Sequence, residues 1–168
     1  MIRDRKAGDL IPAHTLARYG LLIGLALAVV ALDQGVKGIV TATLKGGRTV
    51  ELLGGAVRLD YTWNTGAAFG VFKTGGVFFA LVAALVSAGI LLYYRRIADS
   101  PIIVRAALGL ILGGALGNLI DRIRLGYVVD FIDLRWWPVF NLADSAIVVG
   151  VGLLVVHALF QPVVEHTA

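Results

Sequence analysis

Long apolar stretches dominate the pattern of residues along this chain. Four of them run, with few or no charges, for about the 20 residues that a helix needs to cross a bilayer. They cover residues 19–40, 75–94, 102–120 and 144–160, each bound being approximate. Within the third stretch, small residues recur at helical spacing, which is typical of a close helix-packing face in a membrane: Gly109, Gly113, Gly114 and Gly117. The pattern therefore predicts four transmembrane helices.

The segment from about residue 41 to residue 74, between the first two stretches, has a different pattern. Apolar and polar side chains alternate from Val57 to Trp63, and a period of two indicates a half-buried strand. Residues 49–53 form a second candidate strand, and the glycine pair between the two, Gly54-Gly55, is typical of a hairpin. We expect a small sheet at the membrane surface, with Tyr61 and Trp63 on its apolar face, because aromatic rings are favoured there.

Composition narrows the class of protein. Of the 168 residues, 58% are hydrophobic and 15% are charged, and the mean hydropathy is +0.86. These values exclude an ordinary soluble domain, and the length fits a single domain. We therefore expect an all-α integral membrane protein with four transmembrane helices and a small extracytoplasmic β-sheet or hairpin. The chain contains no cysteine, which excludes disulfides, thiol catalysis and thiolate metal sites.

Basic residues favour one orientation in the membrane. Four spans place both termini on the same side, and cytoplasmic loops carry an excess of Lys and Arg. Of the 15 Lys and Arg, seven fall on each side and Lys37 lies within the first span. The set on the side of the termini is denser because its loops are shorter, which favours cytoplasmic termini. No basic run with interleaved aromatic residues suggests nucleic acid as a partner.

Two aspartates, Asp130 and Asp144, are the strongest candidates for chemistry. Each lies in an apolar stretch beside a predicted span, and they are fourteen positions apart in sequence. A carboxylate at the centre of a membrane helix costs roughly 2.5–3.5 kcal/mol on insertion scales, so a functional role is the first hypothesis. Asp144 also fits a structural role, since Asn141 three positions earlier would make it part of a capping box. Asp130 has no such alternative.

Other polar residues near the ends of the spans have structural as well as functional interpretations. Asn118, Asp121 and Arg122 share one face of the third span, where the adjacent Asp121-Arg122 pair is expected to be a structural tie. Asp33 and Lys37, four positions apart in the first span, are expected to brace that helix.

Residues 64–70, Asn-Thr-Gly-Ala-Ala-Phe-Gly, fit either a turn or a contact with substrate. The chain lacks the motifs that two other classes of hydrolase would need. The three histidines are scattered and form no H-E-x-x-H zinc motif, and no G-x-S-x-G surrounds a serine. An ion-coupled carrier would place acids near the midplane and show a repeat, whereas these acids lie at the ends of spans. A catalytically silent assembly subunit would leave the pairing of Asp130 with Asp144 unexplained.

Four short motifs, in this order, resemble those of the bacterial lipoprotein signal peptidases, also called signal peptidase II. The first two are Asp33-Gln34-x-x-Lys37 and Asn64-Thr65-Gly66-Ala67-Ala68-Phe69. The third is Gly117-Asn118-x-x-Asp121-Arg122, followed by Val129-Asp130-Phe131, and the fourth is Phe140-Asn141-Leu142-Ala143-Asp144-Ser145. The resemblance extends over nearly the whole chain and is specific because all four occur together on a four-span protein.

The resemblance implies a monomeric protease of the bacterial inner membrane that cleaves prolipoproteins before a diacylglyceryl-modified cysteine. Its active site would lie near the extracytoplasmic face, in contact with membrane lipid. Asp130 and Asp144 become the catalytic pair, and no cofactor or metal is needed. Other matched positions are expected to line the site: Asn64, Gly66, Asn118, Arg122, Asn141 and Ala143. A last group is expected to support it: Asp33, Lys37 and Asp121.

Overall fold

The computed structural model describes residues 13–66 and 75–160. Within them the helices are α1 (Ala13–Leu44), α2 (Gly75–Ile97), α3 (Ile102–Leu125) and α4 (Leu142–Leu159). The strands are β1 (Val50–Leu52), β2 (Val57–Asn64) and β3 (Val128–Asp133). Each helix contains a segment long and apolar enough to cross a membrane, which confirms the predicted fold class.

Some positions that the sequence singled out lie outside the described residues. They are Ala67, Ala68 and Phe69 of the second motif, the rest of the segment to residue 74, and the basic Arg3, Arg5 and Lys6.

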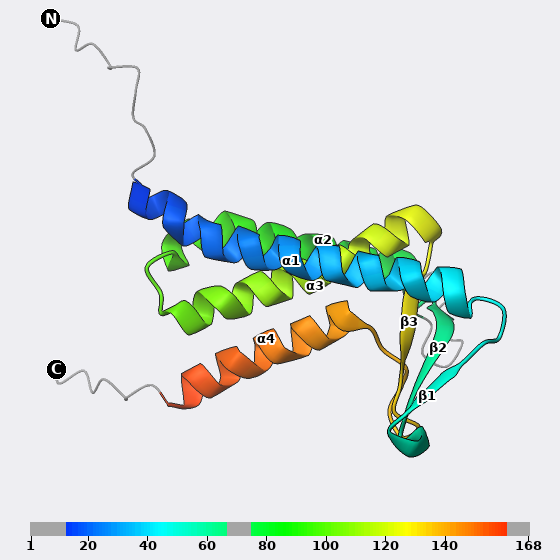
Figure 1. Cartoon of the computed structure of the whole chain (residues 1–168). Coiled ribbons are helices and arrows are strands. Elements are labelled where there is room, and N and C mark those ends of the chain that lie inside the picture. Colours follow the sequence, from blue (N-terminus) through cyan, green and yellow to red (C-terminus); the bar gives the residue numbers. More distant parts are fainter. Residues whose placement is uncertain (1–12, 67–74, 161–168) are drawn as a thin grey trace, which may run out of the picture.

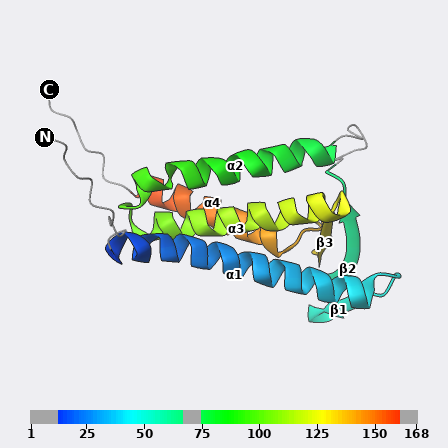
Figure 2. The same ribbon diagram turned by 90° about the horizontal axis from the view of Figure 1, so that it is seen from above.

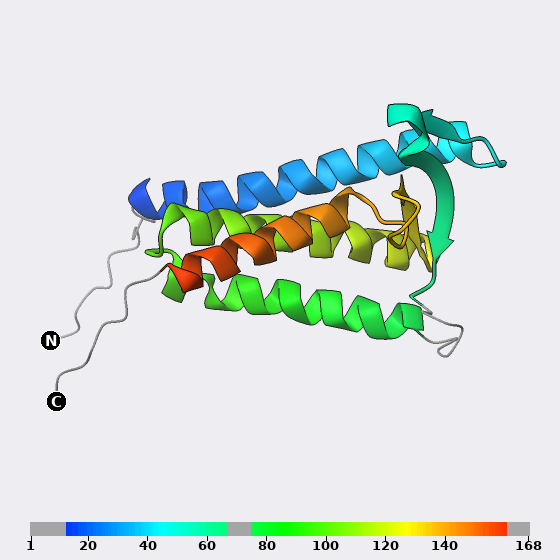
Figure 3. The same cartoon turned by 90° about the horizontal axis from the view of Figure 1, so that it is seen from below.

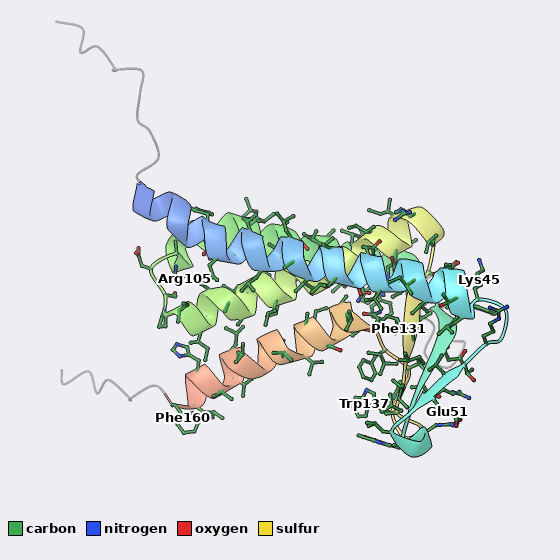
Figure 4. The ribbon with its side chains drawn as sticks, in the orientation of Figure 1. Lys45, Glu51, Arg105, Phe131, Trp137 and Phe160 are labelled. Atoms are coloured by element: carbon green, nitrogen blue, oxygen red, sulfur yellow. The ribbon has the colours of Figure 1, made fainter. Side chains whose placement is uncertain are left out.

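Helix α3 is the centre of the bundle. It packs against α1, α2 and α4, and the ribbon views show it between α1 and α2, with α4 alongside (Figures 1, 2 and 3). The sheet lies at one end of the bundle, against the end of α1 and the start of α4 (Figure 1). Figure 4 shows Lys45, Glu51 and Trp137 at that end, and Arg105 and Phe160 at the other. The polar residues predicted to be functional gather at the sheet end.

The glycines of α3 allow this close packing, as the sequence pattern predicted. A Cβ atom at Gly113 would lie 2.7 Å from the Val29 side chain of α1. At Gly114 it would collide with the Ala143 carbonyl oxygen in the first turn of α4. Helices in a bilayer associate through van der Waals contact rather than through a hydrophobic driving force, so small residues at their interfaces matter. The glycines therefore fix where α4 begins relative to α3.

The predicted hairpin is confirmed, but the sheet has a third strand that the sequence did not predict. Strands β1 and β2 pair antiparallel, with Leu52 opposite Val57, and β3 adds to the other edge of β2. The first four residues of β3, at positions 128–131, are all buried. The sequence of this segment is therefore mostly apolar and shows no alternation of apolar and polar residues. A short run of this kind carries no period that distinguishes a strand from a helix.

Tyr61 and Trp63 lie on one face of the sheet, as the sequence predicted. Val129, Phe131 and the partly buried Tyr61 pack against Val40 near the end of α1. Together these side chains form an apolar core between the sheet and that helix. Trp63 pairs with Val129 and lines a cleft together with Tyr61, so it lies on the same face as expected, although it is 66% exposed. A bulge between Leu59 and Thr62 shifts the register of β2 against β3.

The packing at Gly114 gives a test of the fold. Gly114→Ala should destabilise the protein by about 1–3 kcal/mol because the added methyl group has no space against Ala143 and Ile147. The measurement is the unfolding of purified protein in detergent. The matched control is Gly89→Ala in α2, where a Cβ meets nothing within 4 Å and where alanine favours the helix. Equal stability of the two variants would contradict the close α3–α4 contact.

Candidate active site

Asp130 lies on β3, and its carboxylate is almost fully buried, with 2% of the residue exposed. Two side-chain amides donate to it. Asn64 Nδ2 is 2.9 Å from Oδ2, and Asn141 Nδ2 is 2.7 Å from Oδ1. The carboxylate therefore has a neutral donor on each oxygen, and within the described residues no ion pair joins it to a cation.

Asp144 lies in the first turn of α4 and is half-buried. Its backbone N–H donates to Asn141 Oδ1 at 2.9 Å, and its Oδ2 accepts from the Asn141 backbone N–H at 3.3 Å. This is the capping box that the sequence offered as a structural alternative. The other oxygen, Oδ1, accepts from Asn118 Nδ2 on α3 at 2.7 Å. The structural interpretation of Asp144 is confirmed, and it leaves Oδ1 directed to the same cluster of amides as Asp130.

Asn141 joins the two aspartates. It is fully buried, and besides capping α4 and donating to Asp130 its Nδ2 lies 3.2 Å from Asn118 Oδ1. The chain returns to Asp130 through a second hairpin, in which the backbone N–H groups of Phe131 and Ile132 donate to the Phe140 carbonyl. Phe140 N–H donates back to Ile132 at 3.1 Å. Backbone pairing across this hairpin therefore brings Asn141, and Asp144 after it, beside β3.

Asn64 is held in place by the turn that follows β2. Its Oδ1 accepts from the Gly66 backbone N–H at 2.7 Å, which leaves Nδ2 to donate to Asp130. Gly66 has φ +77°, a left-handed conformation that glycine adopts without strain. The turn is confirmed and it directs Asn64 toward Asp130, whereas contact of this stretch with substrate stays a prediction. Gly66 supports the site by orienting Asn64.

The environment raises the pKa of Asp130 to about 6. Burial is the largest cause, because removal of water disfavours the charged form. The hydrogen bond from Asn64 opposes the increase, the charge of Asp144 adds to it, and the Asn141 hydrogen bond and the Lys37 charge lower it. The influence of Asp144 means that the two carboxyl groups lie close enough for one to affect the protonation of the other.

The prediction that Asp121 and Arg122 form a structural pair is wrong. The buried Asp121 carboxylate pairs with Lys37 of α1 at 2.8 Å, and no ion pair between Asp121 and Arg122 occurs in the described part of the chain. Adjacent residues on a helix point in directions about 100° apart, so each finds a different neighbour. Arg122 instead donates to the Asn118 carbonyl at 3.4 Å and lies over the Phe79 ring, 5.7 Å from its centroid.

The predicted pair in α1 is confirmed and extends further than a helix brace. Lys37 Nζ is 2.8 Å from Asp33 Oδ2, and both side chains are buried. Asp33 in turn accepts from the Ala143 backbone N–H at 3.0 Å. Ala143 itself is fully buried against α3, so it supports the start of α4 and does not line an open surface. Gln34, to which the sequence assigned no role, bridges Asp33 and Asp121 through its Nε2 atom.

Two clefts flank the site. One, of about 380 Å³, lies between the second hairpin and α4, and Asp144 is in its wall. Its other walls are almost entirely apolar: Leu134, Trp136, Trp137, Phe140, Ser145, Val148 and Val149. The second, of about 420 Å³, lies between α2 and α3 and includes Arg122 and Thr65. Across residues 13–66 and 75–160, no group of three or more His, Asp or Glu side chains is arranged to hold a metal ion.

Comparisons with known proteins identify the family. A family model described as signal peptidase (SPase) II matches residues 25–160. The chain belongs to the signal peptidase II family. The lipoprotein signal peptidase of Symbiobacterium thermophilum is 46% identical over 141 residues, which cover 82% of this chain and 93% of the relative. That of Syntrophotalea carbinolica is 39% identical over 160 residues, 91% of this chain and 99% of the relative.

Solved structures agree with this assignment. Two bacterial membrane enzymes superpose on this signal peptidase II family member, each with a TM-score of 0.79. One is 31% identical and covers 89% of this chain and 93% of its own, and the other is 33% identical and covers 85% and 95%. The chain is therefore a multi-pass membrane protein of a peptidase family, with the fold of known membrane enzymes.

The raised pKa of Asp130 predicts how stability depends on pH. Between about pH 4 and pH 6 the folded state keeps the Asp130 proton that the unfolded state releases, so stability falls as pH rises through this window. Asp130→Asn removes this dependence. The difference in unfolding free energy between wild type and variant should change by on the order of 3 kcal/mol from pH 4 to pH 7, measured by denaturant titration in micelles.

Asp133→Asn is the control for this measurement. A backbone hydrogen bond from Arg135 and the nearby Arg58 lower the pKa of Asp133, so this group loses its stabilising effect as pH falls. The two variants should therefore change the pH dependence in opposite directions. A pH dependence that Asp130→Asn leaves unchanged would mean that Asp130 is not the group with the raised pKa.

Proposed function

We propose that this chain is a membrane-embedded aspartic endopeptidase that removes signal peptides from prolipoproteins. It cleaves before a cysteine that already carries diacylglycerol, and Asp130 and Asp144 activate the attacking water. The observation that carries the proposal is the convergence of these two carboxylates, from β3 and α4, on the shared Asn141. The substrate class follows from the relatives named lipoprotein signal peptidases.

The unequal environments of the two aspartates suit acid–base cleavage. Asp130, with a pKa of about 6, holds the shared proton, and Asp144, at the positive end of α4, acts as the base. Asp144 takes a proton from water as the water oxygen bonds to the carbonyl carbon, and Asp130 gives its proton to the carbonyl oxygen. The C–N bond then breaks. Asp144 protonates the leaving nitrogen, and Asp130 recovers a proton from the new carboxyl group.

The cleft beside Asp144 suits a lipid-bearing substrate. Its walls are apolar except at Asp144 and Ser145, and the indole rings of Trp136 and Trp137 form one side. An acyl chain on the substrate cysteine would fill this cleft with little loss of hydrogen bonding, and membrane lipid would occupy it between turnovers. Both aspartates and all three asparagines come from one chain, which supports action as a monomer.

We place both termini in the cytoplasm and the sheet, with the active site, on the extracytoplasmic side of the bacterial inner membrane. The N-terminal end of α1 and the C-terminal end of α4 lie at one end of the bundle, and the sheet lies at the other (Figure 1). A signal peptide is an apolar helix already in the bilayer, so its cleavage site arrives at the outer boundary, where the aspartates would lie.

Asp130→Asn and Asp144→Asn should each abolish cleavage, by at least about 1000-fold, because an amide keeps the shape but cannot exchange the proton. The assay follows release of the signal peptide from a diacylglyceryl-modified prolipoprotein incubated with purified protein in detergent. Asp60→Asn is the control, since Asp60 lies outside the amide cluster and contacts only the neighbouring Tyr61 N–H, at 2.7 Å, and Arg58, at 3.6 Å, among the described residues. Near-normal turnover by either dyad variant in folded form would remove that residue from the mechanism.

Reporter fusions test the orientation. A fusion at Ala98, between α2 and α3, should report the cytoplasm, and one at Lys45, after α1, should report the outside. The expected result follows from the denser basic residues near the termini. The opposite pair of signals would put the aspartates on the cytoplasmic side, where removal of signal peptides does not take place.

A further inference from the structure

A buried ion cluster lies behind the two aspartates, around Lys37. The Lys37 ammonium is 2.8 Å from Asp33 Oδ2 and 2.8 Å from Asp121 Oδ2, and each of these side chains is at most 4% exposed. A buried cluster of charges is seldom more stable than well-packed apolar residues of the same size, because removal of the charges from water is costly. Its presence therefore calls for an explanation other than stability.

Each carboxylate of the cluster accepts a backbone N–H that directly precedes one of the two aspartates of the site. Asp33 Oδ1 accepts from Ala143 at 3.0 Å, and Ala143 comes just before Asp144. Asp121 Oδ2 accepts from Val129 at 3.1 Å, and Val129 comes just before Asp130. The two carboxylates thus hold the start of α4 and the start of β3, and the same ammonium holds both carboxylates.

A third contact of Lys37 orients a side chain of the site. Lys37 Nζ donates to Asn118 Oδ1 at 3.1 Å, and an ammonium group can only donate. The amide of Asn118 must therefore turn its oxygen toward Lys37 and its nitrogen away. That nitrogen is the atom that donates to Asp144 at 2.7 Å. Lys37 is 3% exposed, so its contacts with the site run through these neighbours, while its charge also lowers the pKa of Asp130.

We propose that Lys37 is a positioning residue that sets the separation of the Asp130 and Asp144 carboxylates. It does so by holding Asp33 and Asp121 together, each of which fixes the backbone before one aspartate. The inference rests on the proposed function, in which these two carboxylates act on one water. Catalysis by a pair of groups is sensitive to such placement, and a displacement of about 1 Å can lower the rate roughly 100-fold.

The kinetic test is Lys37→Met, which keeps the length of the side chain and removes the ammonium. In folded protein, kcat for prolipoprotein cleavage should fall by roughly 100-fold while KM stays within about twofold, because the buried Lys37 does not touch substrate. Glu51→Gln is the matched control: it breaks an ion pair of the same 2.8 Å length, with Arg135, on the exposed outer edge of the sheet. A folded Lys37→Met enzyme with kcat within twofold of wild type would overturn the proposal.

Hydrogen exchange tests the geometry without relying on activity. Asp33→Leu and Asp121→Leu are nearly isosteric, remove the acceptor, and each leave Lys37 one carboxylate and the Asn118 oxygen as partners. In mass spectra, Asp33→Leu should speed exchange in peptides that contain Ala143, and Asp121→Leu in peptides that contain Val129. Lys37→Met should speed both. Peptides from α2 are the internal reference, because the hydrogen bonds and ion pairs of the cluster run to α1, α3, α4 and β3.

The two measurements separate the possible failures. If the wild-type protein cleaves no prolipoprotein but exchange rises at the expected amides, the proposed function is wrong and the role of Lys37 in positioning the backbone stands. If exchange rises equally throughout the chain, or at neither amide, the cluster does not position the aspartates and the inference is wrong. The two leucine variants decide this even if Lys37→Met does not fold.

Discussion

The arrangement of the site depends on how the amide of one buried residue, Asn141, is used. Its oxygen accepts the Asp144 backbone N–H that starts α4, while its nitrogen donates to the Asp130 carboxylate on β3. The geometry that caps a helix is therefore the same geometry that brings two acidic side chains together. Because the amide is fully buried, leaving either end without a partner would cost about 1–3 kcal/mol, which favours this single arrangement.

Sequence reasoning succeeded for the elements whose defining contacts are local in the sequence. Four apolar stretches, the Gly54-Gly55 hairpin and the Asn141–Asp144 capping box depend on neighbours a few positions apart, and the structure contains them all. The third strand was missed because its buried residues have no alternation and its partner strand is distant in the sequence. The partner of Asp121 was misassigned for a similar reason. Contact between Asp121 and Lys37 depends on how α1 packs on α3, which adjacency in sequence does not reveal.

The polar network also depends on the apolar packing of the bundle. Glycines at the contacts of α3 let α1 and α4 approach closely enough for buried side chains to meet. Gly117 is the clearest case, since a Cβ there would lie 2.8 Å from Asp33 Oδ2 and 3.4 Å from the Ala143 Cβ. Without that space the Asp33 carboxylate would not reach the backbone of α4. Absence of a side chain at one position thus determines a hydrogen bond between two other helices.

The order in which the chain is made gives the position of α4 a further consequence. Asp130 and its partner Asn64 are synthesised before the last helix, but Asn141 and Asp144 belong to its first turn. During synthesis, the growing chain therefore has only one carboxylate of the pair until α4 has joined α3 in the bilayer. Under the proposed function, the protease stays inactive throughout its own membrane insertion, so its biogenesis needs no separate inhibitory segment to protect neighbouring membrane proteins.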